Sequence, residues 1–180
     1  RLEFRGGLVV SSKDRRFGGL SGIEISDDGR AATIISDLGY ILHADLDYRD
    51  GRLASMSIPR MMRAPLPKAV RRRALEDIAV RDGGVMMLSL ERNAFQIATI
   101  DFKSSGPVVR DLISLPGAAA KLGFNWGIES LAIVPDGTPH AGRLIAIGER
   151  PDKDDASQIP CWIVGAGSCA VKVRGQYDVT

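Results

Sequence analysis

Residues 75–91 read LEDIAVRDGGVMMLSLE, and this stretch decides the fold. An apolar run, a turn with Asp and Gly, and a second apolar run that ends on an acid are typical of a β-hairpin. The pattern recurs at residues 20–37, LSGIEISDDGRAATIISD, and at residues 128–149, IESLAIVPDGTPHAGRLIAIGE. The copies begin at residues 20, 75 and 128, so their spacing is 55 and then 53 residues. A period near 50 residues is typical of propeller blades.

Two further strands are expected after each of the first two hairpins. They lie at residues 40–46 and 52–58 after the first hairpin, and at residues 94–100 and 108–112 after the second. Four strands in each repeat make one blade. The sequence therefore predicts an all-β fold, a β-propeller of four-stranded antiparallel blades, with about three blades in this chain. Their inner strands are predicted near residues 20–26, 75–81 and 128–134.

We expect residues 1–180 to form a single, incomplete propeller domain. Residues 1–16 are expected to be the closing strand of the last blade, and the blades follow at residues 17–60, 75–115 and 125–180. Closed propellers need about four to eight blades. We therefore expect the ring to be completed either by sequence missing from this chain or by a second copy, which would make the protein a homodimer.

The composition is that of a globular domain with a real core. Of the 180 residues, 44% are hydrophobic. There are 24 Lys and Arg against 22 Asp and Glu, and this near balance predicts no nucleic-acid partner. No apolar run reaches the ~18 residues of a membrane-spanning helix.

Two cysteines flank a predicted turn near the end of the chain. Cys161 and Cys169 lie on either side of a Gly-rich stretch at residues 165–168. A hairpin would bring the two sulfurs together, and a disulfide would suit an oxidising compartment. The alternative is two free thiols on a pair of strands.

Several segments resemble one known family. FGGLSGI at residues 17–23, followed by Asp-Gly at 28–29 and Ser-Asp at 36–37, resembles the opening of the phytase-like propeller family, described by its "esterase-like activity of phytase". Glu76-Asp77-Ile78-Ala79 and NWGIESLA at residues 125–132 are similar to that family's later blade starts, except that Asp77 and Ser130 replace a usual Gly.

The resemblance covers most of the chain, and the family is longer than this chain. It implies an exported bacterial protein in a periplasmic or secreted setting. As an activity, it implies hydrolysis of phosphoesters or other esters.

Acidic residues recur at two positions of the repeat. Glu76 and Glu129 share one position, at the start of an inner strand, and Asp37, Glu91 and Glu149 share another, after the second strand. Because blades are related by rotation, equivalent positions form rings about the propeller axis. Clustered carboxylates repel one another unless a cation or Arg compensates, and Ca²⁺ takes six to eight oxygen ligands. We therefore predict a Ca²⁺ site formed by these five acids.

Two arginines directly follow acids of this set. Arg92 and Arg150 are predicted to bind the substrate, a small molecule such as a phosphorylated one. The alternative is that Glu91 and Glu149 pair with these arginines, in a non-enzymatic propeller that binds a ligand or protein partner on one face. No catalytic residue is assigned, since the sequence lacks a nucleophile elbow, a zinc motif and a P-loop. His43, in an alternating strand, is expected to be structural.

Overall fold

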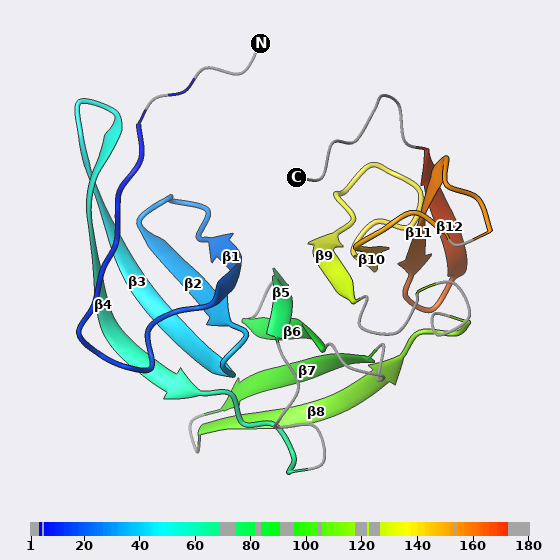
Figure 1. Ribbon diagram of the computed structural model, residues 1–180, viewed down its shortest axis with the longest axis horizontal. Coiled ribbons are helices and arrows are strands. Elements are labelled where there is room, and N and C mark those ends of the chain that lie inside the picture. Colours follow the sequence, from blue (N-terminus) through cyan, green and yellow to red (C-terminus); the bar gives the residue numbers. More distant parts are fainter. Residues whose placement is uncertain are drawn as a thin grey trace.

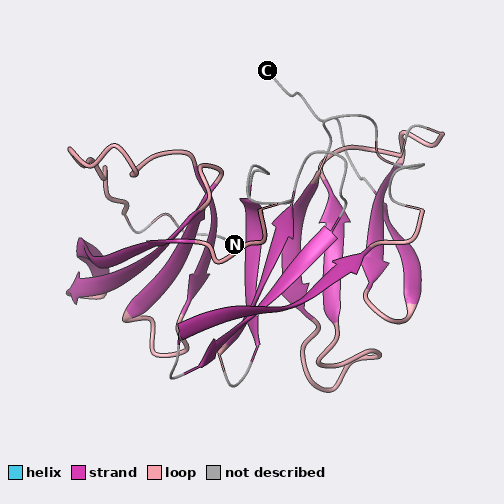
Figure 2. Ribbon diagram, turned by 90° about the horizontal axis from the view of Figure 1, so that it is seen from below, coloured by secondary structure: helices cyan, strands magenta, loops and turns pink. Residues whose placement is uncertain are grey.

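The protein forms three four-stranded antiparallel sheets. The computed structural model describes residues 4, 6–68, 75–81, 84–90, 96–103, 106–117, 122, 127–152 and 154–172. These residues contain strands, turns and loops but no helix (Figure 2). They therefore include no helix long and apolar enough to cross a membrane. The predicted all-β fold of consecutive four-stranded blades is confirmed.

The strands follow one another in each sheet in chain order. Blade 1 holds β1 (Leu20–Ile25), β2 (Ala31–Ser36), β3 (Tyr40–Arg49) and β4 (Arg52–Arg63). Blade 2 holds β5 (Leu75–Arg81), β6 (Val85–Leu90), β7 (Gln96–Lys103) and β8 (Gly106–Ser114). Blade 3 holds β9 (Ile128–Ile133), β10 (Leu144–Gly148), β11 (Gln158–Ile163) and β12 (Gly167–Lys172). The three inner strands lie where the repeat predicts them.

The blades are arranged along an arc (Figure 1). Strands β1, β5 and β9 lie innermost and β4, β8 and β12 outermost. Strand β5 contacts both β1 and β9, so the inner strands hold the arc together. The described part of residues 1–16 contains no strand. Its predicted role as a closing strand, like the closure of the ring, stays a prediction.

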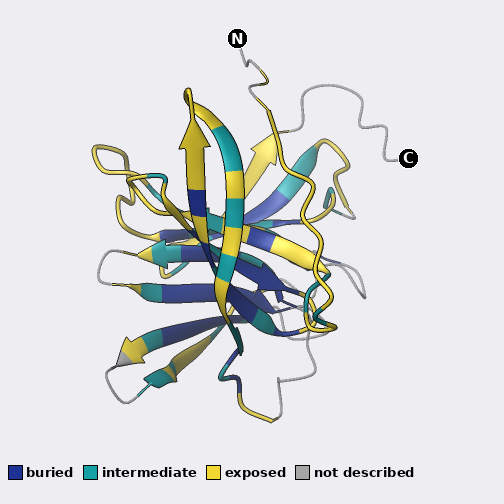
Figure 3. Cartoon of the chain, turned by 90° about the vertical axis from the view of Figure 1, so that its left-hand side faces the viewer, coloured by how far each residue is buried: buried dark blue, intermediate teal, exposed yellow. Residues whose placement is uncertain are grey.

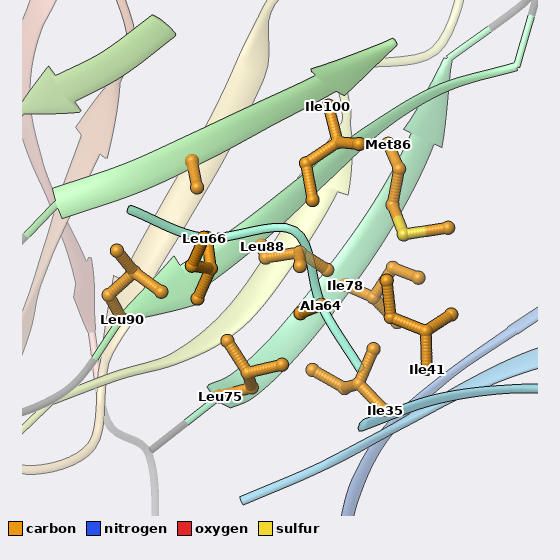
Figure 4. Packing of buried hydrophobic residues seen from close by; sticks show 11 residues of the cluster. Ile35, Ile41, Ala64, Leu66, Leu75, Ile78, Met86, Leu88, Leu90 and Ile100 are labelled. Carbon is orange, nitrogen blue, oxygen red and sulfur yellow. The ribbon is translucent and has the colours of Figure 1, made fainter. Parts of the chain in front are cut away.

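Apolar clusters fill the spaces between neighbouring blades. Successive side chains of a strand point to opposite faces of its sheet, so each blade can pack against two neighbours. Between blades 1 and 2, Ile35 and Ile41 pack with Ile78 and Leu88 (Figure 4). The cluster between blades 2 and 3 contains Ala79, Met87, Ile97, Leu131 and Trp162. Buried residues accordingly concentrate in the strands, and the turns between them are mostly exposed (Figure 3).

Each inner strand has an irregular pairing near its start. The register shifts between Leu20 and Gly22 in β1 and between Leu75 and Ile78 in β5. In blade 3 it shifts where Gly148 pairs with Ile128. Such bulges release backbone groups from the ladder and redirect side chains. They lie at the end of the blades where the predicted acids are found.

Candidate functional site

Two predicted acids occupy matching positions in blades 1 and 3. The backbone N–H of Asp37 donates to the carbonyl oxygen of Gly19 at 2.8 Å, and that of Glu149 donates to Gly127 at 3.1 Å. In both cases the residue after the second strand is tied to the residue just before the inner strand. Asp37 and Glu149 are therefore structurally equivalent. Both are exposed at the same end of their blades.

Asp37 lies directly over the start of β1. A Cβ added to Gly19 would overlap the Asp37 carboxylate, and Gly19 has a φ of +55°, a conformation that favours glycine. The paired glycines before β1 thus leave room for the Asp37 side chain beside the inner strand. Asp37 makes no ion pair with the residues that the structure describes.

Glu76 and Glu129 stand at the same end of the neighbouring blades. Each is the second residue of its inner strand, in β5 and β9, and each is half-buried. We refer to the end of the blades that carries Asp37, Glu76, Glu129 and Glu149 as the acid-bearing face.

The described acids of this face do not by themselves make a cation site. Among the described residues, no three His, Cys, Asp or Glu side chains lie close enough together to hold a metal. Ca²⁺ needs six to eight oxygen ligands, so these residues alone do not fit it. Glu91 lies outside the described residues, as does Arg92, and the five-residue site therefore stays a prediction.

One of the predicted acid–arginine pairs is present. Nε of Arg150 lies 3.3 Å from Oε1 of Glu149, and the pair is largely exposed. Exposed pairs of this kind contribute little to stability. At Glu149 the structure therefore matches the alternative predicted from the sequence, in which the acid pairs with the arginine that follows it.

Asp77, which the sequence marked only as a replacement for Gly, links two blades. Its Oδ2 accepts a hydrogen bond of 2.6 Å from the backbone N–H of Leu131, and its own N–H donates to Oγ of Ser89 at 2.8 Å. Burial raises the pKa of the Asp77 carboxyl, and the hydrogen bonds from the N–H groups of Leu131 and Ile78 oppose that rise. The sequence does not predict this role, because the hydrogen bond from Leu131 joins two blades and no single repeat contains it.

A second acid faces Asp77 from blade 1. Burial raises the pKa of Glu24, and the negative charges of Asp77 and then Asp27 raise it further. Glu24 and Asp27 line a groove of about 310 Å³ between blades 1 and 2, together with Val80 and Arg81. This groove is at the opposite end of the inner strands from the acid-bearing face. The groove forms only where two blades meet, so no single repeat of the sequence predicts it.

The two cysteines are bonded to each other. Cys161 in β11 pairs with Cys169 in β12, and their Cα atoms lie 4.8 Å apart. The hairpin and the disulfide alternative are therefore confirmed. Next to this bond, the Trp162 indole donates to the carbonyl oxygen of Pro116 at 3.0 Å, which ties blade 3 to the end of blade 2.

His43 lies on β3, away from the acid-bearing face. Its ring meets the edge of Phe102 at a centroid distance of 6.3 Å, and burial, followed by the charge of Arg60, lowers its pKa. Its Nε2 is buried and has no hydrogen-bond partner among the residues that the structure describes. The contact with an aromatic ring of blade 2 suits the structural role expected for it.

Comparison with known proteins identifies the family. A search of curated proteins found no match. A solved structure titled "Streptogramin B lyase structure" is similar, with 14% sequence identity and a TM-score of 0.46. The likeness covers 88% of this chain and 42% of that one, so this chain spans less than half of its length. The sequence also matches the family described as "Phytase-like: Esterase-like activity of phytase" over residues 15–177, a range that includes all three blades. The chain therefore belongs to the phytase-like family.

Proposed function

We propose that the protein is an exported phytase-like propeller protein that binds a small phosphorylated or other ester ligand at its acid-bearing face and hydrolyses it. The observation that carries this proposal is the matched pair of hydrogen bonds, from Asp37 to Gly19 and from Glu149 to Gly127. They support a site assembled from repeated positions, with carboxylates at one end of successive blades.

The acid-bearing face offers negative charge to a cation and positive charge to an anionic ligand. Asp37 is exposed and has no ion-pair partner among the described residues, which leaves its carboxylate available. Arg150 offers a guanidinium, a group that binds phosphate and carboxylate through paired hydrogen bonds. We propose Ca²⁺ as the cofactor. Because the described acids do not complete a cation site, Ca²⁺ binding requires ligands beyond them, with Glu91 as the first candidate from the repeat.

The disulfide supports export. Bonds such as Cys161–Cys169 form and persist in oxidising environments, including the bacterial periplasm and the extracellular medium. We therefore propose a periplasmic or secreted location, which cell fractionation with a tagged chain would test.

A second candidate is a propeller that binds a ligand or protein partner without catalysis. The ion pair between Glu149 and Arg150 favours it, because a neutralised acid contributes less to a cation site. Among the described residues, no three His, Cys, Asp or Glu side chains lie close enough to hold a metal, and this also favours the second candidate.

Hydrolysis of p-nitrophenyl phosphate and p-nitrophenyl acetate, with and without Ca²⁺, tests the first proposal. The wild-type protein should release p-nitrophenol, and Asp37→Asn should lower the rate at least about tenfold, as expected for loss of one charge-stabilising group. Asp136→Asn is the matched control, because Asp136 is an exposed residue of the β9–β10 turn, at the other end of the blades. Binding of phosphate without turnover would favour the second candidate, and neither turnover nor binding would contradict both.

A further inference from the structure

A groove between blades 2 and 3 is lined by three arginines. It has a volume of about 360 Å³, and Arg81, Arg110 and Arg143 reach it from β5, from β8 and from the residue just before β10. Arg81 ends the strand whose second residue is Glu76, and the strand that follows Arg143 ends just before Glu149. The groove therefore lies toward the opposite end of the blades from the acid-bearing face. We call it the arginine groove.

Two of the arginines are held where blades 2 and 3 meet. Nη2 of Arg81 donates to the carbonyl oxygen of Gly142 at 2.8 Å, which ties this guanidinium of blade 2 to blade 3. The carbonyl oxygen of the adjacent Arg143 accepts a hydrogen bond of 2.8 Å from the N–H of Val134. Its Nη1 lies against the β11–β12 turn, 3.2 Å from where a Cβ of Gly165 would stand. A guanidinium has five N–H donors, so the bond to Gly142 leaves most of those of Arg81 available to a ligand.

A β-bulge brings the third arginine to the same groove. Thr99 pairs with Asp111 and Ile100 pairs with Val109, so Arg110 is the extra residue of the bulge. Successive side chains of a regular strand point to opposite faces, whereas Arg110 and Asp111 both line the groove. The bulge thus redirects a positive charge into the space between the blades.

The positive charge of the groove exceeds its negative charge. Asp111 is the one acid among the described residues that line it, which leaves a formal charge of +2. Nε of Arg110 lies 3.7 Å from Oδ2 of Asp111, and its Nη1 lies 3.9 Å from Oδ1 of Asp101, both longer than a hydrogen bond. Arg81 and Arg143 make no ion pair with the residues that the structure describes. An entering anion therefore meets guanidinium groups that no described carboxylate holds by a hydrogen bond.

The repeat does not require an arginine at position 81. Arg81 stands four residues after Asp77, and the equivalent residues are Ser26 in blade 1 and Val134 in blade 3. Inner strands of this protein thus pack with a small polar or an apolar residue at this position. The charge of Arg81 is a feature of the junction between blades 2 and 3, and packing of the blade does not account for it.

The floor of the groove is apolar. Met87 and Leu144 are buried there, and Ile113 and Val164 are half-buried. Charges next to apolar surface interact more strongly than charges surrounded by water. The floor also offers a contact for an apolar part of a ligand.

We propose that the arginine groove binds a small phosphate monoester with an apolar group, its phosphate on the guanidinium groups and its apolar group on the floor. A phosphate monoester carries close to two negative charges at pH 7, which matches the charge of the groove. Guanidinium groups bind phosphate through paired hydrogen bonds. The inference goes beyond the proposed hydrolysis, because the two sites lie at opposite ends of the blades and share no residue.

Isothermal titration calorimetry with phenylphosphonate, without Ca²⁺, tests the site. This probe has a carbon–phosphorus bond, so hydrolysis of esters does not consume it. The wild-type protein should bind one molecule, and Arg143→Gln and Arg110→Gln should each weaken binding at least about tenfold through loss of charged donors. Arg143→Lys keeps the charge and should weaken binding less than Arg143→Gln. Arg52→Gln is the matched control, because Arg52 is exposed on β4 of blade 1 and its loss should leave binding unchanged.

Two further measurements separate this site from a loss of folding and from the acid-bearing face. Circular dichroism follows the fold of each variant, and Arg110→Gln, a change at an exposed side chain, decides the outcome if Arg143→Gln does not fold. Arg150→Gln should bind phenylphosphonate like the wild type, and a loss of binding there would assign the anion to the acid-bearing face and contradict the proposal. So would no saturable binding by the wild type up to about 10 mM, or equal weakening in Arg52→Gln and Arg143→Gln. Inorganic phosphate that binds as tightly as phenylphosphonate would contradict the proposed contact with the floor.

Discussion

Leu131 in blade 3 donates its backbone N–H to the Asp77 carboxylate in blade 2, at 2.6 Å. From the other side, Gly22 of blade 1 comes so close that an added Cβ would lie 2.9 Å from Cα of Asp77. Asp77 thus bonds to blade 3 and sets the spacing to blade 1. One position of the repeat is occupied by Gly22 in blade 1, Asp77 in blade 2 and Ser130 in blade 3. Blade 2 contacts both of its neighbours through this position.

Replacing Asp77 should weaken this junction. Asp77→Ala leaves the N–H of Leu131 without its acceptor, and we expect a loss of about 1–3 kcal/mol in the free energy of unfolding. Asp77→Asn should cost less, because the amide oxygen can still accept. Urea unfolding gives the difference, with Asp136→Ala as an exposed control. Equal stability of Asp77→Ala and the wild type would show that the bond contributes nothing.

Gly22→Ala should push blades 1 and 2 apart. The new methyl group would lie 2.8 Å from Oδ1 of Asp77 and 3.0 Å from the backbone nitrogen of Ile78. Because Ile78 backbone atoms cannot give way as a side chain can, we expect about 1–3 kcal/mol of destabilisation. Gly7→Ala is the control, since the nearest atom to its added Cβ is 3.9 Å away. Thermal unfolding should show a lower midpoint for Gly22→Ala only.

Stability should depend on pH through Glu24 and Asp77. Both pKa values are raised in the folded protein, by burial first and, for Glu24, by the charge of Asp77 next. A raised pKa means that the folded state binds the proton more tightly than the unfolded state does. Each carboxyl therefore contributes favourably to the free energy of unfolding below its unfolded pKa, near 4, and this contribution is lost as pH rises through the folded pKa.

Glu24→Gln should therefore stabilise the protein at pH 7, by less than about 0.5 kcal/mol because solvent screens a partly exposed group. The difference from wild type should vanish by about pH 3, where the Glu24 carboxyl is already protonated. Chemical unfolding at several pH values measures it. A Glu24→Gln variant that is less stable than wild type at pH 7 would contradict the prediction, because it would mean that a favourable interaction compensates the Glu24 charge.

The disulfide should stabilise the hairpin of β11 and β12 at the outer edge of blade 3. Cys161 and Cys169 are separated by 8 positions, and a bond closing so short a loop is expected to contribute about 2–3 kcal/mol. The double variant Cys161→Ala with Cys169→Ala should unfold at lower denaturant, and reductant should shift the wild type but not the variant. Two free thiols in the untreated protein would contradict the bond.

The repeat predicted the fold because hairpin signals are local in sequence. The spacing of the copies located β1, β5 and β9, and it also identified Asp37 and Glu149 as equivalent, since both follow a second strand. The role of Asp77 and the raised pKa of Glu24 arise from contacts across blade boundaries, and no single repeat contains that information. The pairing of Glu149 with Arg150 was predicted only as an alternative, because adjacent residues of opposite charge need not meet.

Thermal unfolding with and without Ca²⁺ tests the central proposal, a ligand-binding acid-bearing face, most directly. An ion that binds only the folded state must raise the midpoint, by roughly 5–10 °C at a hundredfold excess over its dissociation constant. We predict such a rise for the wild type and a much smaller one for Asp37→Asn with Glu149→Gln. A midpoint that does not respond to Ca²⁺, or a rise of equal size in the double variant, would contradict the account.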